Sequence, residues 1–300
     1  MQKIFAVIVT YNPPEKLLER IESIAQQVSQ IIIIDNGSNA ENLKIISSIQ
    51  QKFAPDISIV LNEKNVGLAS ALNQGIKISI EQKADWVLLL DHDSTPEKNM
   101  LTKMFAAHEK YPDKNKIAQI VPEIRDQNVN EITKYLLENG KYLFKRSTIN
   151  EEYSDKILTA ITSGSLIKTE IFAKLGLMSE HFFIDYIDHE FCLRLKKNGY
   201  KILLTKDAML DHRLGDKTRF DILGTSIITT NHSAFRRYYI FRNRLWVCKK
   251  YYRDFPNFII HDSLAGIYDF LRIIFFENNK SDKLFSAIRG LFAGMQKEPK

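Results

Sequence analysis

Apolar residues in the first third of the chain form short continuous runs that alternate with segments of helical spacing. The continuous runs are residues 4–9, 31–34, 57–61 and 86–90. The segments with apolar residues every three or four positions are 15–28, 43–53 and 68–80. Strands that are apolar on both faces and separated by helices are typical of parallel sheets with right-handed crossovers. We therefore predict an α/β fold with a mostly parallel, doubly wound sheet.

The remainder of the chain is less regular. The predicted elements are a helix at 96–111, strands at 117–121, 157–161 and 200–204, and a helix from about residue 188 to residue 199. Residues 123–155 are polar and weakly periodic, so we expect loops and short strands there. Residues 258–295 predict two or three helices with more apolar surface than they can bury among themselves. This surface fits packing on the preceding domain, on a second copy or on a membrane, and the pattern leaves these alternatives open.

Two carboxylates, Asp91 and Asp93, directly follow the apolar strand 86–90. Ligands of open α/β sheets bind at the carboxyl ends of the strands. Carboxylate oxygens suit Mg²⁺ or Mn²⁺, and such a metal can connect a protein to phosphate oxygens. The chain has neither of the glycine-rich phosphate-binding fingerprints, so a metal on Asp91 and Asp93 is the candidate means of holding phosphates. The alternative interpretation is an ordinary solvated turn.

A second acidic group occupies the aromatic stretch before the helix at 188–199. Asp188 fits a helix cap, but Asp185 and Glu190 lie close to it, and clustered carboxylates in apolar surroundings are candidates for a general base. His212 follows a strand and can complete a metal site. Gly164 follows strand 157–161, and it serves either the approach of a substrate or a simple turn.

Composition limits the class of protein. The chain has 300 residues, of which 44% are hydrophobic and 26% charged, so it is an ordinary globular protein and not a disordered one. Its two cysteines, Cys192 and Cys248, are far apart, and we interpret them as packing residues in a reducing compartment. The N-terminus lacks the pattern of a signal peptide and no run reaches about 20 apolar residues, so we expect a cytoplasmic protein.

The net charge is +6, and a basic and aromatic segment lies at residues 236–253. Such a segment fits phosphates, nucleic acid or an anionic lipid surface. A polyanion-binding protein is therefore the alternative from another functional class. That alternative leaves Asp35, Asp91, Asp93 and Asp188 unexplained, because carboxylates repel phosphate unless a metal intervenes, and we expect no nucleic-acid partner.

Several short motifs resemble glycosyltransferase family 2, whose members are inverting enzymes with a GT-A fold, over about residues 4–250. The motifs are Val7-Ile8-Val9-Thr10-Tyr11-Asn12, Ile34-Asp35-Asn36-Gly37-Ser38, Asn65-Val66-Gly67 with Asn73 and Gly75, Asp91-His92-Asp93, Ser163-Gly164-Ser165 and Asp188-His189-Glu190-Phe191-Cys192-Leu193-Arg194. His212 and the segment Tyr239-Ile240-Phe241-Arg242-Asn243 resemble the bacterial rhamnosyltransferase branch. The resemblance implies a GT-A fold with a C-terminal helical extension.

The resemblance also implies a nucleotide-sugar site. Its residues would be Thr10, Tyr11, Asn12, Asp35, Asn36, Asn65, Gly67, Asn73, Asp91, Ser163, Gly164, Arg242 and Asn243. Among these, Thr10 and Tyr11 would border the base and Asp35 would bond the base or ribose. Arg242 and Asn243 would hold the leaving diphosphate.

Metal and base follow from the same resemblance. Asp91, Asp93 and His212 would hold Mn²⁺ or Mg²⁺, and Asp188 matches the catalytic base. Family members commonly carry an acidic residue immediately before that base, whereas this chain has Ile187, so the role of Asp185 stays open. Direct displacement by an acceptor hydroxyl that Asp188 deprotonates would invert the sugar carbon.

These expectations define an enzyme. We expect a metal-dependent inverting glycosyltransferase that moves L-rhamnose from dTDP-L-rhamnose onto a bacterial cell-surface polysaccharide, such as O-antigen, or onto its lipid-linked precursor. A UDP-sugar is the alternative donor. We expect a catalytic domain at 1–220, with a nucleotide-sugar half (1–95) and an acceptor half (96–220), and a helical region at 221–300. This region would contact a membrane surface or form a homodimer, which makes the enzyme peripheral on the inner face of the cytoplasmic membrane.

Overall fold

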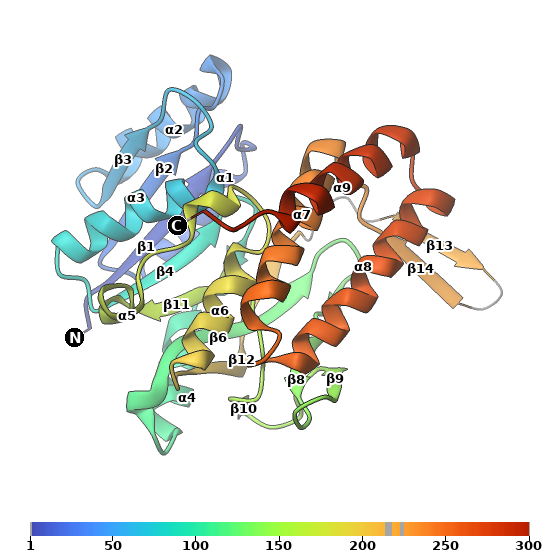
Figure 1. The fold of residues 1–300 in the computed structure, drawn as a ribbon. Coiled ribbons are helices and arrows are strands. Elements are labelled where there is room, and N and C mark those ends of the chain that lie inside the picture. Colours follow the sequence, from blue (N-terminus) through green and yellow to red (C-terminus); the bar gives the residue numbers. More distant parts are fainter. Residues whose placement is uncertain (1, 214–217, 223–224, 300) are drawn as a thin grey trace.

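The computed structural model describes residues 2–213, 218–222 and 225–299, and it shows a mixed sheet followed by long helices (Figure 1). The strands are β1 (Ile4–Thr10), β2 (Gln30–Asp35), β3 (Ile57–Leu61), β4 (Trp86–Asp91), β5 (Thr95–Pro96), β6 (Ile117–Asp126), β7 (Glu131–Ile132), β8 (Tyr135–Glu138), β9 (Phe144–Ser147), β10 (Tyr153–Ser154), β11 (Ser165–Lys168), β12 (Lys201–His212), β13 (Thr218–Ile222) and β14 (Thr225–Thr229). The α-helices are α1 (Leu17–Ala25), α2 (Ala40–Phe53), α3 (Leu68–Glu81), α4 (Met100–Lys110), α5 (Thr169–Leu175), α6 (Ile187–Lys197), α7 (Ala234–Tyr251), α8 (Pro256–Phe276) and α9 (Lys280–Met295).

The central sheet has the strand order β10-β12-β6-β11-β4-β1-β2-β3. Strands β1 to β4 are mutually parallel, which confirms the prediction from their continuous apolar runs. Strand β11 runs antiparallel to both of its neighbours, β4 and β6, and β12 is again parallel to β6. The carboxyl ends of β1, β2, β4 and β12 therefore reach the same edge of the sheet.

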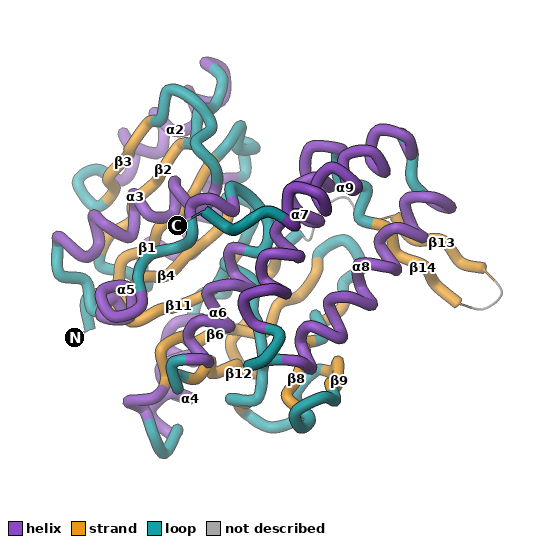
Figure 2. Tube along the Cα trace, viewed as in Figure 1, coloured by secondary structure: helices purple, strands orange, loops and turns teal. Residues whose placement is uncertain are grey.

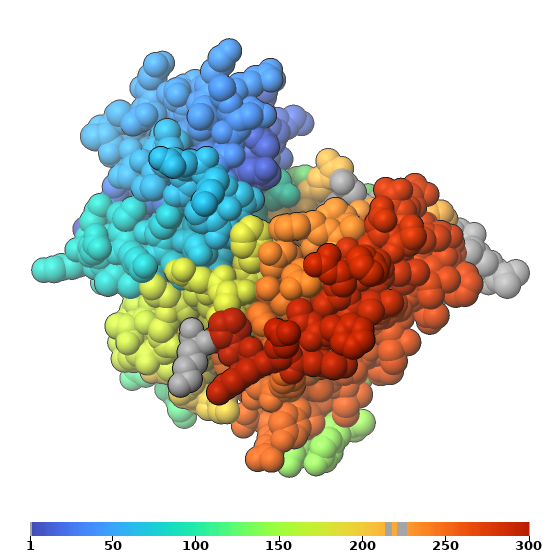
Figure 3. Space-filling view, turned by 45° about the horizontal axis from the view of Figure 1, so that its top comes forward, coloured from blue at the N-terminus to red at the C-terminus, as the bar shows by residue number. Residues whose placement is uncertain are grey.

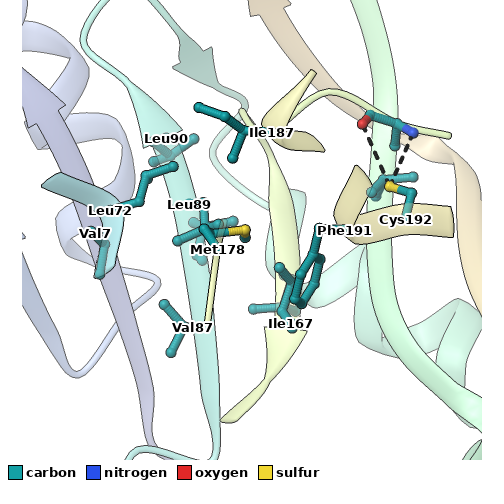
Figure 4. Packing of buried hydrophobic residues seen from close by; sticks show 14 of the residues in the cluster. Val7, Leu72, Val87, Leu89, Leu90, Ile167, Met178, Ile187, Phe191 and Cys192 are labelled. Carbon is teal, nitrogen blue, oxygen red and sulfur yellow. Dashed lines mark hydrogen bonds between the residues drawn. The ribbon is translucent and has the colours of Figure 1, made fainter. Parts of the chain in front are cut away.

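Helices cover both faces of this sheet. Helices α3, α5 and α6 lie in front of it in Figure 1. In Figure 4, Leu72 of α3 lies beside β4, and Phe191 of α6 lies beside Ile167 of β11. Helix α4 packs on the opposite face, where the ring of Phe105 lies 5.5 Å from that of Trp86. Strand β4 is thus buried on both faces, as its apolar run predicts.

One predicted strand is wrong. Residues 157–161 do not form a strand; Ile157 makes an isolated bridge to Leu137. This run is apolar because it lies under α6, where the Ala160 N–H contacts the Cys192 sulfur at 3.5 Å (Figure 4). Cys192 is buried and Cys248 is partly buried, and both are free of disulfides.

Other boundaries shift for identifiable reasons. Helix α4 begins at Met100 and not at residue 96, because Thr95 and Pro96 pair with β12. Strand β12 continues from Lys201 to His212 through a register shift after Thr205. Between residues 123 and 155 the end of β6 and the short strands β7 to β10 appear, as predicted for that segment.

The C-terminal helices form a layer beside the sheet (Figure 2). The predicted helical region at 258–295 is present as α8 and α9, which pack on α7, and α7 packs on α6. The hairpin of β13 and β14 crosses residue 220, where we expected the domain boundary. Within the described residues, none of the helices combines the length and the apolar character that crossing a membrane requires.

Candidate active site

Asp91, Asp93 and His212 come together at the carboxyl edge of the sheet. Asp91 ends β4, Asp93 lies in the turn that follows, and His212 ends β12. One ligand atom from each side chain lies within 4.8 Å of the others. The imidazole Nδ1 is 3.2 Å from Asp93 Oδ1, and Nε2 is 3.9 Å from Asp91 Oδ2. The structure therefore joins residues 121 positions apart into the group that the sequence predicts as a metal site.

Two buried serines hold this group in place. The Ser94 hydroxyl lies 2.8 Å from His212 Nδ1 and 2.6 Å from the Ser163 hydroxyl. Ser163 also accepts a hydrogen bond of 3.1 Å from the Asp91 backbone N–H. Such contacts orient a ligating imidazole and fix its tautomer. Ser163 thus supports the metal group, and Ser94 is a positioning residue that the sequence reasoning missed, although it directly follows Asp93.

Gly164 serves packing at the start of β11. Its φ is +83°, its N–H donates to the Leu89 carbonyl at 2.9 Å, and a Cβ would lie only 2.9 Å from the Leu210 side chain. The positive φ and the tight packing account for the glycine as a turn residue. Its direct contact with the donor stays a prediction.

The electrostatics of the three ligands fit a divalent cation. Burial raises the pKa of Asp91, and the nearby charges of Asp93 and Asp188 raise it further, against the effect of His212. Burial would also raise the pKa of Asp93, but the hydrogen bond and charge of His212 outweigh it and lower that pKa. Asp93 Oδ1 is buried, and its short contact with His212 Nδ1 lacks the geometry of a full hydrogen bond. Two carboxylates and an imidazole suit Mn²⁺, and Mg²⁺ through the oxygens.

The ends of β1 and β2 form a second part of the edge. Thr10 donates to Asp35 Oδ2 at 2.9 Å, and the Ser38 backbone N–H donates to Asp35 Oδ1, also at 2.9 Å. These bonds hold the Asp35 carboxylate in place. Tyr11 is exposed beside them, and the Asn12 backbone N–H donates to the Ser38 hydroxyl at 2.7 Å. This part of the edge therefore combines the exposed Tyr11 ring with a hydrogen-bonded group of Thr10, Asp35 and Ser38.

Asn36, Asn65 and Gly67 shape the loop that precedes α3. Asn36 Nδ2 donates to Asn65 Oδ1 at 3.1 Å, and Asn36 Oδ1 accepts from the Val66 backbone N–H at 3.0 Å. The Gly67 N–H donates to Asn65 Oδ1 at 2.9 Å. Gly67 has φ +91°, and a Cβ there would meet the Phe183 ring at 2.7 Å. The loop therefore needs glycine at this position to lie against the segment that leads to Asp188.

Asp188 lies in the first turn of α6, where the helix dipole favours an anion. Its Oδ1 accepts from the His189 backbone N–H at 2.8 Å and lies 3.0 Å from the His189 ring Nδ1. Burial would raise the pKa of Asp188, but the charge and hydrogen bonds of His189 outweigh it and lower that pKa. Asp188 is therefore an ionised carboxylate at neutral pH. Its negative charge also contributes to the raised pKa of Asp91.

The segment before Asp188 is strained. Phe183, Asp185 and Tyr186 all have positive φ, between +63° and +68°. Non-glycine residues rarely adopt this conformation, and it concentrates at functional sites. The Asn243 amide holds the segment by donating to the carbonyls of Ile184 and Asp185 at 2.9 Å each.

Arg242 and Asn243 make contacts within the protein. The Arg242 guanidinium donates to the His181 carbonyl at 2.6 Å and to Asn243 Oδ1 at 2.9 Å, and it stacks on Trp246. Asn243 is fully buried. Both side chains bond backbone carbonyls of the chain before Asp188 and so support the strained segment. Their expected contact with the diphosphate stays a prediction.

Asn73 has a comparable supporting role. Its Nδ2 donates to the Met178 carbonyl at 2.9 Å and to Glu180 at 2.8 Å, and its Oδ1 accepts from the Met178 N–H at 2.9 Å. The side chain is buried and its polar atoms are occupied. It ties α3 to the chain that leads to Asp188, and its direct contact with the nucleotide sugar stays a prediction.

Arg236 is the cation that the sequence reasoning did not assign to the site. It forms a two-pronged ion pair with Asp185, with distances of 2.6 and 3.1 Å. Burial would lower its pKa, but the hydrogen bond and charge of Asp185 and the charges of Asp91 and Asp188 raise it. Arg236 lies in the basic segment 236–253, but the segment alone does not distinguish it from Arg242. Arg237 and Arg244 of that segment are buried in internal ion pairs, which removes them from any polyanion-binding surface.

A mixed sheet of this order, with a carboxylate and imidazole group at its edge, fits the GT-A-like fold of glycosyltransferases. The family model described as "Glycosyl transferase family 2" matches residues 5–176. The chain is also 32% identical over 251 residues to the dTDP-rhamnosyl transferase RfbF of Shigella flexneri, covering 82% of this chain and 80% of that protein. The chain belongs to glycosyltransferase family 2 and is a glycosyltransferase.

Solved structures show the same fold. TarS (residues 1–349) of S. aureus in complex with UDP-GlcNAc has a TM-score of 0.59 at 14% identity, over 98% of this chain and 81% of that one. The mannosyltransferase PcManGT of Pyrobaculum calidifontis, in complex with GDP-Man and Mn²⁺, has a TM-score of 0.56 at 15% identity, over 98% and 75%. At these identities the likeness concerns the fold.

Proposed function

We propose that this glycosyltransferase moves L-rhamnose from dTDP-L-rhamnose to a hydroxyl of a bacterial cell-surface polysaccharide or of its lipid-linked precursor. The donor is supported by the similarity to a protein named as a dTDP-rhamnosyl transferase, over most of both chains. The chemistry is supported by one structural observation: Asp91, Asp93 and His212 come together at the carboxyl edge of the sheet. The lowered pKa of Asp188 and the contribution of its charge to the raised pKa of Asp91 agree with a base near this group.

Asp91, Asp93 and His212 would hold Mn²⁺ or Mg²⁺, which when bound supplies positive charge to the donor diphosphate. Asp35 and Tyr11 would bind the nucleoside, with Thr10 and Ser38 fixing the Asp35 carboxylate. Asn12, Asn36, Asn65 and Gly67 would form the walls around it.

Asp188 would take the proton of the acceptor hydroxyl as its oxygen attacks the anomeric carbon. A new C–O bond forms on one face of the sugar while the bond to the phosphate oxygen breaks on the other, so the product has the inverted configuration. Arg236 would stabilise the leaving diphosphate, the role that the sequence assigned to Arg242. Asp185 would orient Arg236, because both of its carboxylate oxygens bond that guanidinium.

The proposed reaction is tested by release of dTDP. Purified enzyme receives Mn²⁺, dTDP-L-rhamnose and a bacterial lipid extract as the source of acceptor, and a matched reaction contains UDP-glucose. We expect dTDP release from the rhamnose donor, and its loss in Asp188→Asn with donor binding retained. Turnover of UDP-glucose alone would favour the alternative donor class, and full activity of Asp188→Asn would place the base elsewhere.

We also propose that the enzyme works at the inner face of the cytoplasmic membrane, where a lipid-linked acceptor carries its saccharide.

A further inference from the structure

Helix α8 has apolar residues on two faces. Its charged residues Asp262, Asp269 and Arg272 face the protein, where they contact Arg244 and one another. Phe258 and Ile273 are buried beside them, whereas a second set of apolar residues faces outward along one stripe. This stripe consists of Ile260, Leu264, Ile267, Tyr268, Leu271, Ile274 and Phe275, with exposed fractions from 41% to 65%. A helix that packs on a protein normally buries such a stripe, so the outward face needs a partner.

Helix α9 repeats this arrangement by a different means. It packs on α7 through small residues: a Cβ on Gly290 would lie 2.3 Å from the Tyr238 carbonyl oxygen, and one on Gly294 would lie 2.8 Å from that of Arg242. Leu284 and Leu291 of α9 pack against the core, but four other large apolar residues of this helix are exposed. They are Phe285, Ile288, Phe292 and Met295. Figure 3 shows α8 and α9 together on one face of the molecule.

The outward stripes cannot turn inward without breaking the fold. The close contact at Gly290 leaves no room for a larger side chain against α7. The inward face of α8 is fixed by the bond of 2.7 Å from the Tyr186 hydroxyl to Asp262 and by the pair of Arg244 and Asp269 at 3.0 Å. We name the stripes of α8 and α9 together the apolar face.

The charge distribution distinguishes the candidate partners. Residues 231–300 contain thirteen lysines and arginines against six aspartates and glutamates, whereas residues 1–230 contain 29 against 30. The whole basic excess of the protein therefore belongs to the segment that carries the apolar face. Arg253, Lys280, Arg289 and Lys297 of this segment are exposed. A second copy docked face to face would bring two basic segments together, whereas an anionic lipid surface attracts them.

We infer that the apolar face of α8 and α9 docks on an anionic phospholipid bilayer, with its side chains in the interface and the exposed basic residues at the headgroups. The apolar face is thus the surface through which the enzyme would reach its proposed location at the membrane. The biological purpose of this docking rests on the proposed function, but lipid binding itself can be measured without any sugar transfer.

Vesicle flotation at low salt tests this inference with the full chain. The vesicles are phosphatidylcholine alone or phosphatidylcholine with about one third phosphatidylglycerol. We expect the wild type to float with the anionic vesicles and to be released by salt. The double variant Ile267→Glu with Leu271→Glu should bind these vesicles roughly tenfold more weakly or worse, because it removes apolar contact and adds negative charge. The double variant Lys280→Glu with Arg289→Glu should lose binding to the anionic vesicles, while its binding to phosphatidylcholine vesicles should not change.

The matched control is Leu61→Glu, which changes a similarly exposed apolar residue at the end of β3. It should float like the wild type. Circular dichroism and binding of dTDP-L-rhamnose should be unchanged in every variant. These two controls distinguish an error in the docking inference from an error in the proposed sugar donor. Wild-type protein that stays at the bottom of the gradient would overturn the inference. A dimer in sedimentation that the α8 variant dissociates, without vesicle binding, would assign the apolar face to a second copy.

Discussion

At the scale of single residues, the pair of Asp188 and His189 sets the pH range of the proposed reaction. The charge and hydrogen bonds of His189 lower the pKa of Asp188 against the effect of burial. The same interaction raises the pKa of His189, which burial alone would lower. A carboxylate base must be ionised to accept a proton, so the acidic limb of the activity profile reports the pKa of Asp188.

His189→Phe should therefore move this limb. Burial of Asp188 remains in the variant while the opposing charge is gone, so the pKa of Asp188 rises and the acidic limb of kcat/KM shifts to higher pH. The profile is measured from about pH 4 to 9 with dTDP-L-rhamnose. A limb that stays in place, or that moves to lower pH, would contradict the assignment of Asp188 as the base.

Arg236 and Arg242 offer a matched pair of variants. Arg236→Gln removes the cation that faces Asp185, Asp91 and Asp188, and kcat should fall by roughly 10²–10³ with little change in unfolding temperature. Arg242→Gln should instead lower the unfolding temperature, because its guanidinium bonds backbone carbonyls. The measurements are steady-state kinetics and thermal unfolding. The reverse pattern would return the diphosphate contact to Arg242.

The sequence identified the acidic residues of the candidate site better than its cation. Asp91, Asp93 and Asp188 each occur in a short motif at a strand end or helix start, so their places followed from local pattern. Arg236 and Arg242 lie on the same helix, six positions apart. The rotation of α7 against the strained segment decides which of them faces Asp185. That rotation depends on tertiary packing around Asn243, which no local pattern contains.

At the scale of elements, the C-terminal helices depend on buried ion pairs. Arg237 of α7 and Glu277 at the end of α8 are both almost fully buried, and their nitrogen and oxygen lie 2.5 Å apart. Lys283 of α9 reaches the other Glu277 oxygen at 2.9 Å. Removal of one partner from a buried pair leaves an uncompensated charge, which costs far more than loss of an exposed pair.

Glu277→Gln should consequently lower the free energy of unfolding by about 3–5 kcal/mol, measured by urea denaturation. The control is Glu22→Gln, which breaks an exposed pair with Lys52 and should cost less than about 1 kcal/mol. Equal effects of the two variants would show that the charge network does not hold α7, α8 and α9 together.

The elements that the sequence predicted best are those whose pattern is local. Strands β1 to β4 and helix α3 follow from apolar runs and helical spacing. The predicted strand at residues 157–161 was wrong because burial of a loop under α6 gives the same apolar pattern as a buried strand. The antiparallel strand β11 could not be predicted, since its four residues carry no signal of direction.

At the scale of the whole molecule, the sheet edge and the C-terminal helices meet at the segment before Asp188. Helix α8 contacts this segment through Tyr186 and Asp262, and α7 contacts it through Asn243 and Arg236. The chain thus connects the apolar face to the proposed base through a few buried contacts. A lipid-linked acceptor at a bilayer would approach the enzyme from the side that carries these helices.

The central claim is that the Asp91, Asp93 and His212 group binds a dTDP-sugar through a divalent metal. The most direct measurement is calorimetric titration of dTDP-L-rhamnose and UDP-glucose, with and without Mn²⁺, into the wild type and into the variant Asp91→Asn with Asp93→Asn. The account predicts Mn²⁺-dependent binding of dTDP-L-rhamnose that the variant loses. Binding of equal strength without metal, or binding that the variant keeps, would contradict it.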